Sequence, residues 1–207
     1  YIIFTSGSSG IPKGVQISHA SFSNYLQWAR ACYVDSGSVL DFSLFTSISF
    51  DLTLTSIFLP LISGSSILLQ GHDVRSSLYE SFYGETPASI VKITPSHIDL
   101  LSSFDYKPTL VKKVIVGGEL LRVSHVQFLY SINADIQIFN EYGPTETTVG
   151  CTVKEITSIE DVKNKSVGMP AWNTQIYIMD DSMQLLDMGL EGQIYIAGDG
   201  LSSGYMN

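Results

Sequence analysis

The stretch SIVKITPSHIDLL, residues 89–101, contains a short apolar run immediately before the predicted start of a helix. We expect the strand over Ser89 to Ile93. Pro95 suits the first helical position, where no backbone N–H is needed, and Thr94 before it can cap the helix. The alternation continues with a strand, a helix and a strand predicted over 110–116, 123–132 and 136–139. This βαβα order predicts an α/β fold with a largely parallel sheet flanked by helices.

The preceding segment fits the same architecture. Ser18 can cap a helix that runs to about Tyr33. Asp51 can cap a second helix, which Pro60 is expected to kink or shorten. A strand and a helix are then predicted over 66–70 and 76–83.

The pattern changes after Gly150. Here β-runs are separated by turns, and strands are predicted over 151–156, 175–179 and 192–197. We therefore expect two parts in the chain, a βα core over 1–150 and the start of a more antiparallel β layer over 151–207.

Composition limits the classes of protein to consider. The chain has 207 residues, of which 44% are hydrophobic and 15% charged, as is typical of a globular protein. Its formal net charge of −9 argues against a nucleic-acid partner. Apolar runs such as 54–62 are too short to cross a bilayer, so we expect no membrane partner and a cytoplasmic location. Cys32 and Cys151 lack the spacing of a zinc site or a disulfide framework.

The stretch TSGSSGIPKG, residues 5–14, has the composition of a phosphate-binding loop. Its glycines allow backbone N–H groups to gather around an anion, while hydroxyls and Lys13 add donors and one positive charge. It does not match the Walker pattern G-x-x-x-x-G-K-[ST], because Pro12 precedes Lys13 and Gly14 follows it. A solvated Ser/Gly linker is the alternative. The predicted phosphate-binding residues are Thr5, Ser6, Gly7, Ser8, Ser9, Gly10 and Lys13.

The stretch NEYGPTE, residues 140–146, is a second cluster of chemically useful side chains. It comes just after the predicted strand 136–139, and ligands of parallel sheets bind beyond the carboxyl ends of the strands. A bare turn would account for Gly143 and Pro144 alone. The cluster also supplies an aromatic stacking surface, phosphate donors and a carboxylate able to hold Mg²⁺.

These two stretches, with Phe50-Asp51, GGE at 117–119 and GQIYIAG at 192–198, resemble motifs of a known family. The chain resembles the adenylate-forming enzymes, and within them the adenylation domains of nonribosomal peptide synthetases. The resemblance covers essentially the whole chain and implies a partial AMP-binding domain over 1–207. It also implies that the ribose-binding Thr-Gly-Asp motif and the small C-terminal subdomain, with its catalytic lysine, are absent.

The resemblance implies a reaction with two steps. An amino-acid carboxylate attacks ATP to give an aminoacyl-adenylate and pyrophosphate, and the acyl group then passes to the phosphopantetheine thiol of a carrier domain. The implied partners are the amino acid and the peptidyl carrier and condensation domains of the same synthetase.

The resemblance also assigns roles to residues. Lys13, Thr145 and Glu146 are the implied catalytic residues, with Thr145 on the α-phosphate and Glu146 holding Mg²⁺. Tyr142 would stack on adenine, and Asn140 with the backbone of Gly118 and Glu119 would read its amino edge. Gly143 completes the implied ATP-binding set.

A substrate pocket follows from the same resemblance. Asp51 would pair with the α-ammonium group of the substrate, and the alternative role for Asp51 is a helix cap alone. The implied side-chain pocket consists of Leu52, Thr55, Lys92, Ile115, Gly117, Glu141, Val149 and Gly150.

Lys92 and Glu141 are the two charged members of this pocket. A carboxamide would satisfy both, because its oxygen accepts from the lysine and its NH₂ group donates to the glutamate. A carboxylate would face Glu141, and an aliphatic side chain would leave both charges unpaired. Asparagine is therefore the predicted substrate, with glutamine and aspartate as alternatives. Lys92 and Glu141 could instead pair with each other, or Lys92 could extend to solvent.

Two other functions stay open from the sequence. An acyl-CoA ligase of the same superfamily is disfavoured by Asp51 and the two pocket charges. The chain could also be an inactive nucleotide-binding fragment, because the ribose motif and the C-terminal lysine are expected to be absent.

Overall fold

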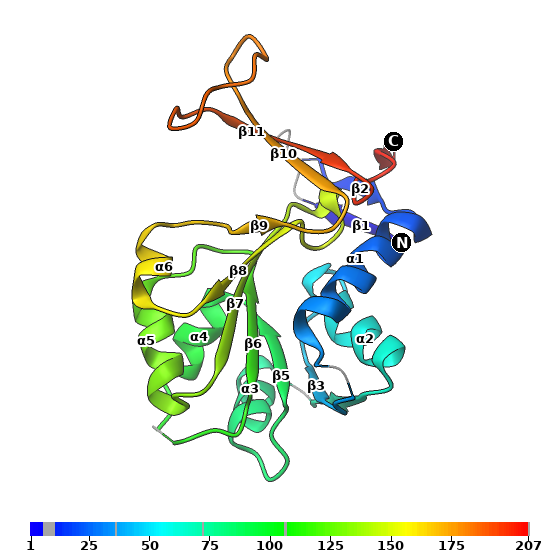
Figure 1. Ribbon diagram of the computed structural model, residues 1–207. Helices are drawn as coiled ribbons and strands as arrows, with labels where there is room; N and C mark the ends of the chain where they lie inside the picture. The colour runs from blue at the N-terminus through cyan, green and yellow to red at the C-terminus, as the bar shows by residue number, and fades with distance from the viewer. Residues whose placement is uncertain (6–10, 36, 72, 106, 207) are drawn as a thin grey trace.

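The structure is a computed structural model that describes residues 1–5, 11–35, 37–71, 73–105 and 107–206. Within these residues, the largest sheet has seven strands in the order β4-β3-β5-β6-β7-β8-β9 (Figure 1). The first five of that order are parallel, and β8 and β9 pair antiparallel at one edge. The predicted fold class is confirmed. In chain order the strands are β3 Asp41–Leu44, β4 Ser66–Leu69, β5 Ile90–Ile93, β6 Lys113–Gly117, β7 Gln137–Tyr142, β8 Thr152–Ile156 and β9 Met169–Pro170.

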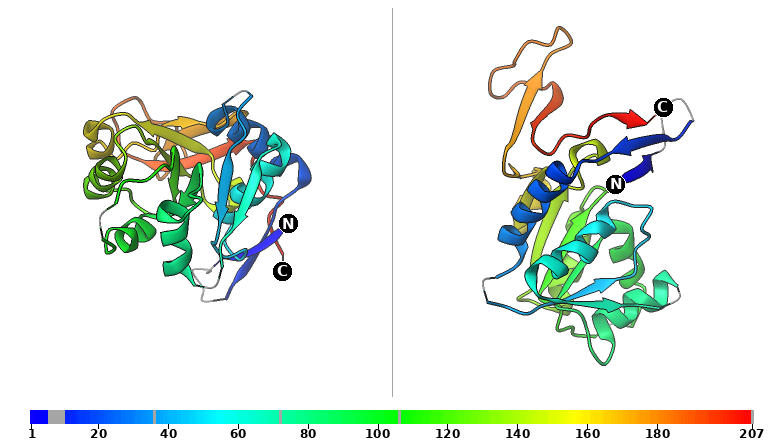
Figure 2. Two further views of the ribbon diagram at one scale, coloured as in Figure 1. Left: turned by 90° about the horizontal axis from the view of Figure 1, so that it is seen from below. Right: turned by 90° about the vertical axis from the view of Figure 1, so that its right-hand side faces the viewer.

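Helices cover both faces of this sheet (Figures 1 and 2). One face carries α1 (His19–Tyr33) and α2 (Leu52–Ser63). The other carries α3 (Val74–Tyr83), α4 (Pro95–Leu101) and α5 (Val123–Ile132), and the short α6 (Ile159–Lys163) packs beside α5. None of the helices in the described ranges combines the length and the apolar character that a bilayer-spanning segment needs.

Strand alternation divides the core into two clusters, one on each face of the sheet. Val91 and Ile93 of β5 pack in the cluster that α3, α4 and α5 cover. Ile90 of the same strand packs in the cluster beneath α1 and α2. Lys92 therefore shares the α1/α2 face with Ile90, and its side chain is directed at a core instead of at solvent.

Smaller β structures lie beyond the main sheet. The strands β1 (Ile2–Thr5) and β2 (Lys13–Gln16) form an antiparallel pair, which β12 (Tyr205–Met206) joins along β2 (Figure 2, right). The strands β10 (Thr174–Met179) and β11 (Gln193–Gly198) form a separate antiparallel ribbon, which projects away from the main sheet in Figure 1.

Most predicted helices are found where the sequence placed them. Ser18 caps α1 by accepting a hydrogen bond from the Ser21 N–H at 3.0 Å, and α4 begins at Pro95 after Thr94. The expected shortening at Pro60 was wrong, since α2 continues past it to Ser63 and ends at Gly64, which has a left-handed φ of 65°. The alternative expectation, a kink at Pro60, stays a prediction.

The strand predictions need four corrections. The strand β3 was not predicted, and β7 extends to Tyr142, so the first three residues of NEYGPTE belong to the strand instead of following it. The strand predicted from 110 begins only at Lys113, where pairing with Ile90 starts. The predicted change to antiparallel pairing occurs at Thr152, but β8 and β9 extend the main sheet, while β10 and β11 pair with each other and β12 pairs with β2.

The cluster beneath α5 gives a test of the fold. Leu129 is fully buried in it, so Leu129→Ala should lower the free energy of unfolding by about 2–5 kcal/mol, because it removes apolar contacts and leaves a cavity. Urea-induced unfolding would measure the loss. Leu110→Ala is the matched control: Leu110 is 76% exposed, and we expect a change within about 0.5 kcal/mol. Equal effects would contradict the described core.

Candidate functional site

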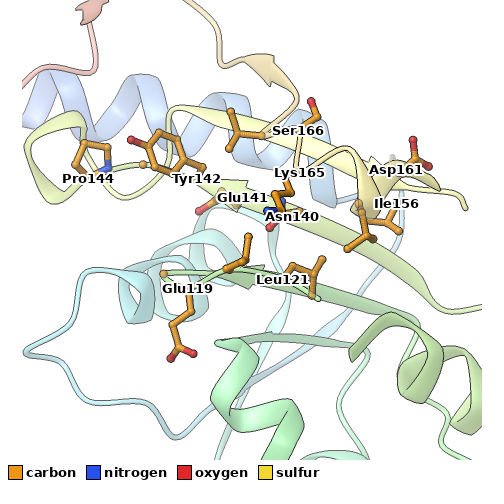
Figure 3. Close-up of a pocket in the computed structure, with 15 residues that line it drawn as sticks. Glu119, Leu121, Asn140, Glu141, Tyr142, Pro144, Ile156, Asp161, Lys165 and Ser166 are labelled. Carbon is orange, nitrogen blue, oxygen red and sulfur yellow. The ribbon is translucent and has the colours of Figure 1, made fainter. Parts of the chain in front are cut away.

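The carboxyl ends of the parallel strands β5, β6 and β7 meet at one edge of the sheet. Ligands of parallel α/β sheets bind at this edge. Two cavities open there, one of about 460 Å³ and one of about 30 Å³, and Gly118, Glu141 and Gly143 line both. The larger is drawn in Figure 3.

The larger cavity brings together all the residues predicted to bind adenine. Asn140 and Tyr142 reach it from β7, and Gly118 and Glu119 from the turn after β6. Tyr142 and Pro144 lie at one end of the cavity, and Ile156 and Asp161 at the other (Figure 3). The remaining lining residues were not predicted; they are Leu120, Leu121, Ile156, Asp161, Val162, Lys165, Ser166 and Val167.

Glu119 contributes its backbone to this cavity. Its side chain points away from the cavity in Figure 3, and Oε2 accepts hydrogen bonds from the Ser96 N–H at 3.2 Å and the Ser96 hydroxyl at 2.6 Å. The carboxylate is thus engaged at the start of α4, and the role of the Gly118 and Glu119 backbone in reading adenine stays a prediction. Gly118 has a φ of +83°, which favours glycine, and a Cβ there would lie 3.1 Å from the Phe50 ring.

The predicted phosphate-binding residues lie partly outside the described ranges. Thr5 and Lys13 stand opposite each other in the β1–β2 pair, so the two ends of the stretch are held together. Ser6, Gly7, Ser8, Ser9 and Gly10 fall outside the described residues.

Lys13 and Glu146 both contact the side chain of Tyr205. The Lys13 ammonium lies 5.1 Å from the centroid of the Tyr205 ring, and the Tyr205 hydroxyl donates to Glu146 Oε1 at 2.7 Å. Glu146 follows Thr145 in the 3₁₀ turn η1 (Thr145–Thr147), directly after β7. Lys13 of β2 and Glu146 after β7, both predicted to act on the phosphates, therefore lie close to the same aromatic side chain.

The chemistry of this region fits a magnesium ion bound with a triphosphate. No cluster of three or more His, Cys, Asp or Glu side chains suited to a metal is found in the part of the chain that the structure describes. Mg²⁺ in nucleotide sites is commonly held by one or two carboxylates together with substrate phosphates. Glu146 is partly exposed and supplies one such carboxylate.

Asp51 lines the smaller cavity and has an unsatisfied carboxylate oxygen. The residue is only 4% exposed, and Oδ2 has no hydrogen-bond partner among the described residues. Burial raises the pKa of Asp51, although the Thr145 hydroxyl and the charge of Lys92 oppose that rise. Its side chain makes no capping hydrogen bond to α2, so a helix cap alone does not explain it. The site is suited to a cationic partner.

Lys92 and Glu141 form a buried ion pair, and both line this cavity. Their exposed fractions are 3% and 4%, so Lys92 does not extend to solvent. Lys92 Nζ also donates to Thr55 Oγ1 at 2.8 Å and to the Tyr25 hydroxyl at 3.0 Å. The Tyr33 hydroxyl donates to Glu141 Oε2 at 2.6 Å. The two charges therefore converge as predicted, but they pair with each other, which was the alternative.

The other predicted pocket residues surround this pair. Lys92 stands opposite Ile115 in the sheet, and Gly117 stands opposite Glu141. A Cβ on Gly117 would lie 3.0 Å from the Glu141 carbonyl oxygen, and one on Gly150 would lie 2.5 Å from the Glu141 carboxylate. The two glycines thus leave room for the glutamate. Leu52 and Val149 line the cavity directly.

Tyr25 and Tyr33 are the site residues that the sequence did not reveal. Periodicity placed Tyr25 on the apolar face of a helix, where a core role is the ordinary expectation. Burial raises the pKa of both phenols, and the charge of Glu141 raises it further. Both therefore remain hydrogen-bond donors near neutral pH.

Similarity to known proteins extends over nearly the whole chain. Residues 1–206 match the family model of the AMP-binding enzymes. Over its whole length the chain is 43% identical to bacitracin synthase 3 of Bacillus licheniformis and 43% identical to tyrocidine synthase 3 of Brevibacillus parabrevis. It spans only 3% of the length of either relative.

Solved structures give the same result. A four-domain nonribosomal peptide synthetase, holo-AB3403 bound to AMP and glycine, aligns with 99% of this chain at a TM-score of 0.82 and 26% identity, and the aligned part is 15% of that protein. O-succinylbenzoate coenzyme A synthetase of Bacillus subtilis, in complex with ATP and magnesium ion, aligns with 100% of this chain at a TM-score of 0.80. The aligned part is 42% of that enzyme, and at 20% identity the likeness shows the fold alone. With its family model matched from residue 1 to residue 206, the chain belongs to the AMP-binding enzymes.

Proposed function

We propose that this chain is the ATP- and substrate-binding part of an enzyme that activates an amino acid, asparagine in the first place, as its aminoacyl-adenylate. One observation carries the proposal. A buried carboxylate with an unpaired oxygen, Asp51, lies in the same cavity as the buried Lys92–Glu141 pair. The first suits the α-ammonium of an amino acid, and the second suits a side chain with one donor and one acceptor.

ATP would bind across the carboxyl edge of the sheet. The cavity of about 460 Å³ has the size of a small-molecule site, which is typically on the order of 300–1,000 Å³. Tyr142 is 37% exposed and offers its ring for stacking, and Asn140 offers an amide for the adenine edge. Gly143 allows the close approach of this turn to Gly150, since a Cβ would lie 2.7 Å from the Gly150 Cα.

The chemical step joins two anions. A carboxylate oxygen of the amino acid forms a bond to the α-phosphorus, and the bond from that phosphorus to the bridging oxygen breaks, which releases pyrophosphate. Such a step needs alignment and positive potential more than proton transfer. Lys13 supplies positive charge, and the Thr145 hydroxyl supplies a donor. Glu146 would hold Mg²⁺, which neutralises phosphate charge when bound.

The direct contact between Lys92 and Glu141 limits which substrate side chains can bind. The cavity of about 30 Å³ holds roughly the volume of one water molecule in the liquid. A side chain can extend into it only by separating Lys92 from Glu141. A carboxamide replaces the contact that it breaks with one hydrogen bond to each charge. An aliphatic side chain would leave Lys92 and Glu141 paired with each other, and it would find no room in the cavity.

Aspartate and glutamine fit less well. The carboxylate of aspartate would meet Glu141, a like charge, at close range. Glutamine is longer by one methylene, a difference worth only about 1–3 kcal/mol in a pocket. An acid without an ammonium group would leave the buried Asp51 oxygen unpaired, which disfavours a fatty or aryl acid.

The activated acyl group would then pass to a phosphopantetheine thiol. The 43% identity to two peptide synthases supports this part of the proposal. On this view a peptidyl carrier domain and a condensation domain of the same synthetase are the partners.

Exchange of labelled pyrophosphate into ATP tests the proposed function. Measured on the full-length protein over all amino acids, exchange should be strongest with asparagine and absent with fatty acids. Exchange with fatty acids alone would indicate an acyl-CoA ligase instead. Nucleotide binding without exchange for any acid would indicate an inactive nucleotide-binding protein.

Glu141→Gln tests the amide assignment. It removes the charged acceptor for the substrate NH₂ and the repulsion of a substrate carboxylate, so the preference for asparagine over aspartate should fall roughly 10- to 100-fold. The measurement is the ratio of kcat/KM values in the exchange assay. Glu155→Gln, on the exposed part of β8, is the matched control and should leave the ratio unchanged. An unchanged ratio in the Glu141→Gln variant would contradict contact between Glu141 and the substrate side chain.

Asp51→Asn tests ammonium recognition. It removes the charge opposite the α-ammonium, so kcat/KM for the amino acid should fall roughly 30-fold or more while the KM for ATP changes little. The pKa of Asp51 is raised in the free protein. Only ionised Asp51 attracts the ammonium, so kcat/KM should decline with falling pH at a value above the ordinary aspartate pKa of about 4. This acid limb should disappear in Asp51→Asn, and its persistence would assign it to another group.

A further inference from the structure

The helix α1 places two tyrosines against the buried ion pair. Tyr25 is 2% exposed and Tyr33 is fully buried, and both phenol oxygens reach the Lys92–Glu141 pair on the α1/α2 face of the sheet. Neither belongs to the pocket that the sequence predicted. Their hydroxyl groups determine how the two charges are held.

The Lys92 ammonium has three N–H donors, and protein acceptors take all of them. One goes to Glu141 Oε1, the second to Thr55 Oγ1 at 2.8 Å, and the third to the Tyr25 oxygen at 3.0 Å. Tyr25 and Thr55 are themselves 2.6 Å apart and hydrogen-bonded. Lys92 would therefore remain anchored by two acceptors if its contact with Glu141 were broken.

Glu141 is anchored in the same way on its other side. Oε2 accepts the Tyr33 O–H at 2.6 Å, while the Tyr25 hydroxyl is farther from the two carboxylate oxygens, at 3.4 and 3.3 Å. Oε1 makes the contact with Lys92. If that contact opened, Tyr33 would still hold the carboxylate.

The Tyr33 ring is itself held firmly. It packs edge-on against Phe139 at a centroid distance of 5.2 Å and against Trp28 at 5.9 Å. Lys113 of β6 donates to the Tyr33 carbonyl oxygen at 3.0 Å and to Asp35 at 2.9 Å, which fixes the end of α1 to the sheet. A phenylalanine could keep these ring contacts and lose only the hydroxyl.

We propose that Tyr25 and Tyr33 are positioning residues for substrate specificity. They keep Lys92 and Glu141 in position when a substrate carboxamide displaces the direct contact between these two residues. This inference rests on the proposed function. In this arrangement, the Lys92–Glu141 contact is the bond that the substrate replaces. The amide then enters between two charged groups that do not need to be repositioned. Pre-arranged groups of this kind lower the cost of binding.

Three tyrosine-to-phenylalanine variants test the inference in the full-length protein. Tyr33→Phe releases Glu141, so the kcat/KM preference for asparagine over aspartate should fall roughly tenfold or more. Tyr25→Phe removes an acceptor of Lys92, so the KM should rise several-fold for both substrates. The KM for ATP should stay constant in both. Tyr79→Phe is the control: Tyr79 lies on α3, on the opposite face of the sheet, its hydroxyl accepts a hydrogen bond from Lys107, and no kinetic change is expected.

The outcomes separate this inference from the proposed function. A wild-type protein that prefers asparagine, with an unchanged asparagine-to-aspartate ratio in a folded Tyr33→Phe variant, would overturn the positioning role alone. A fall in thermal stability without a change in that ratio would do the same, since a purely structural role predicts it. If Tyr33→Phe does not fold, Tyr25→Phe decides: an unchanged KM for asparagine overturns the inference. A wild-type protein that activates no amino acid would overturn the proposed function, and this inference with it.

Discussion

The buried pairing of Lys92 with Glu141 is the interaction around which the site is built. Moving two charges out of water is costly, and a buried ion pair contributes little net stability unless further hydrogen bonds satisfy both groups. Tyr25, Tyr33 and Thr55 supply those hydrogen bonds. Removal of one partner of such a pair typically costs about 3–5 kcal/mol, because the other charge is left alone. The arrangement makes sense as a device for recognition more than as a source of stability.

Because side chains alternate along a strand, the main sheet can hold this ion pair on one face and pack an apolar core on the other. The β5 strand presents Val91 and Ile93 to the apolar cluster beneath α3, α4 and α5. Its Lys92 emerges on the other face, near the carboxyl edge, two strands away from Glu141. In β6, the strand between them, the residue paired with Glu141 is Gly117. Because glycine has no side chain, nothing at this position separates the two charges.

The order of elements and the gathering of site residues were accessible from the sequence, and the contacts within the site were not. Apolar periodicity and helix caps locate α1, α4 and α5, because those signals are local. β3, of only four residues, was missed, and β7 is longer than its apolar part, because partner strands and not local preference set those limits. The role of Tyr33 depends on where α1 ends relative to β7, a contact across 108 residues of sequence. Burial of a tyrosine could be expected, but its hydrogen-bond partner could not.

The turn after β7 connects the two halves of the proposed reaction. Thr148 and Val149 have φ values of 60° and 67°, and for a β-branched residue such a left-handed conformation costs on the order of 1–3 kcal/mol. Neighbouring hydrogen bonds hold this backbone in place, from the Thr148 N–H to Thr145 at 3.2 Å and from the Thr148 hydroxyl to Gly200 at 2.7 Å. The turn thereby sets Val149 in the cavity of Asp51, while Glu146 near its start accepts a hydrogen bond from Tyr205, whose ring lies beside Lys13. On the proposed function, this backbone would set the distance between the side-chain pocket and the phosphate site, so the substrate carboxylate would approach the α-phosphate from a fixed direction.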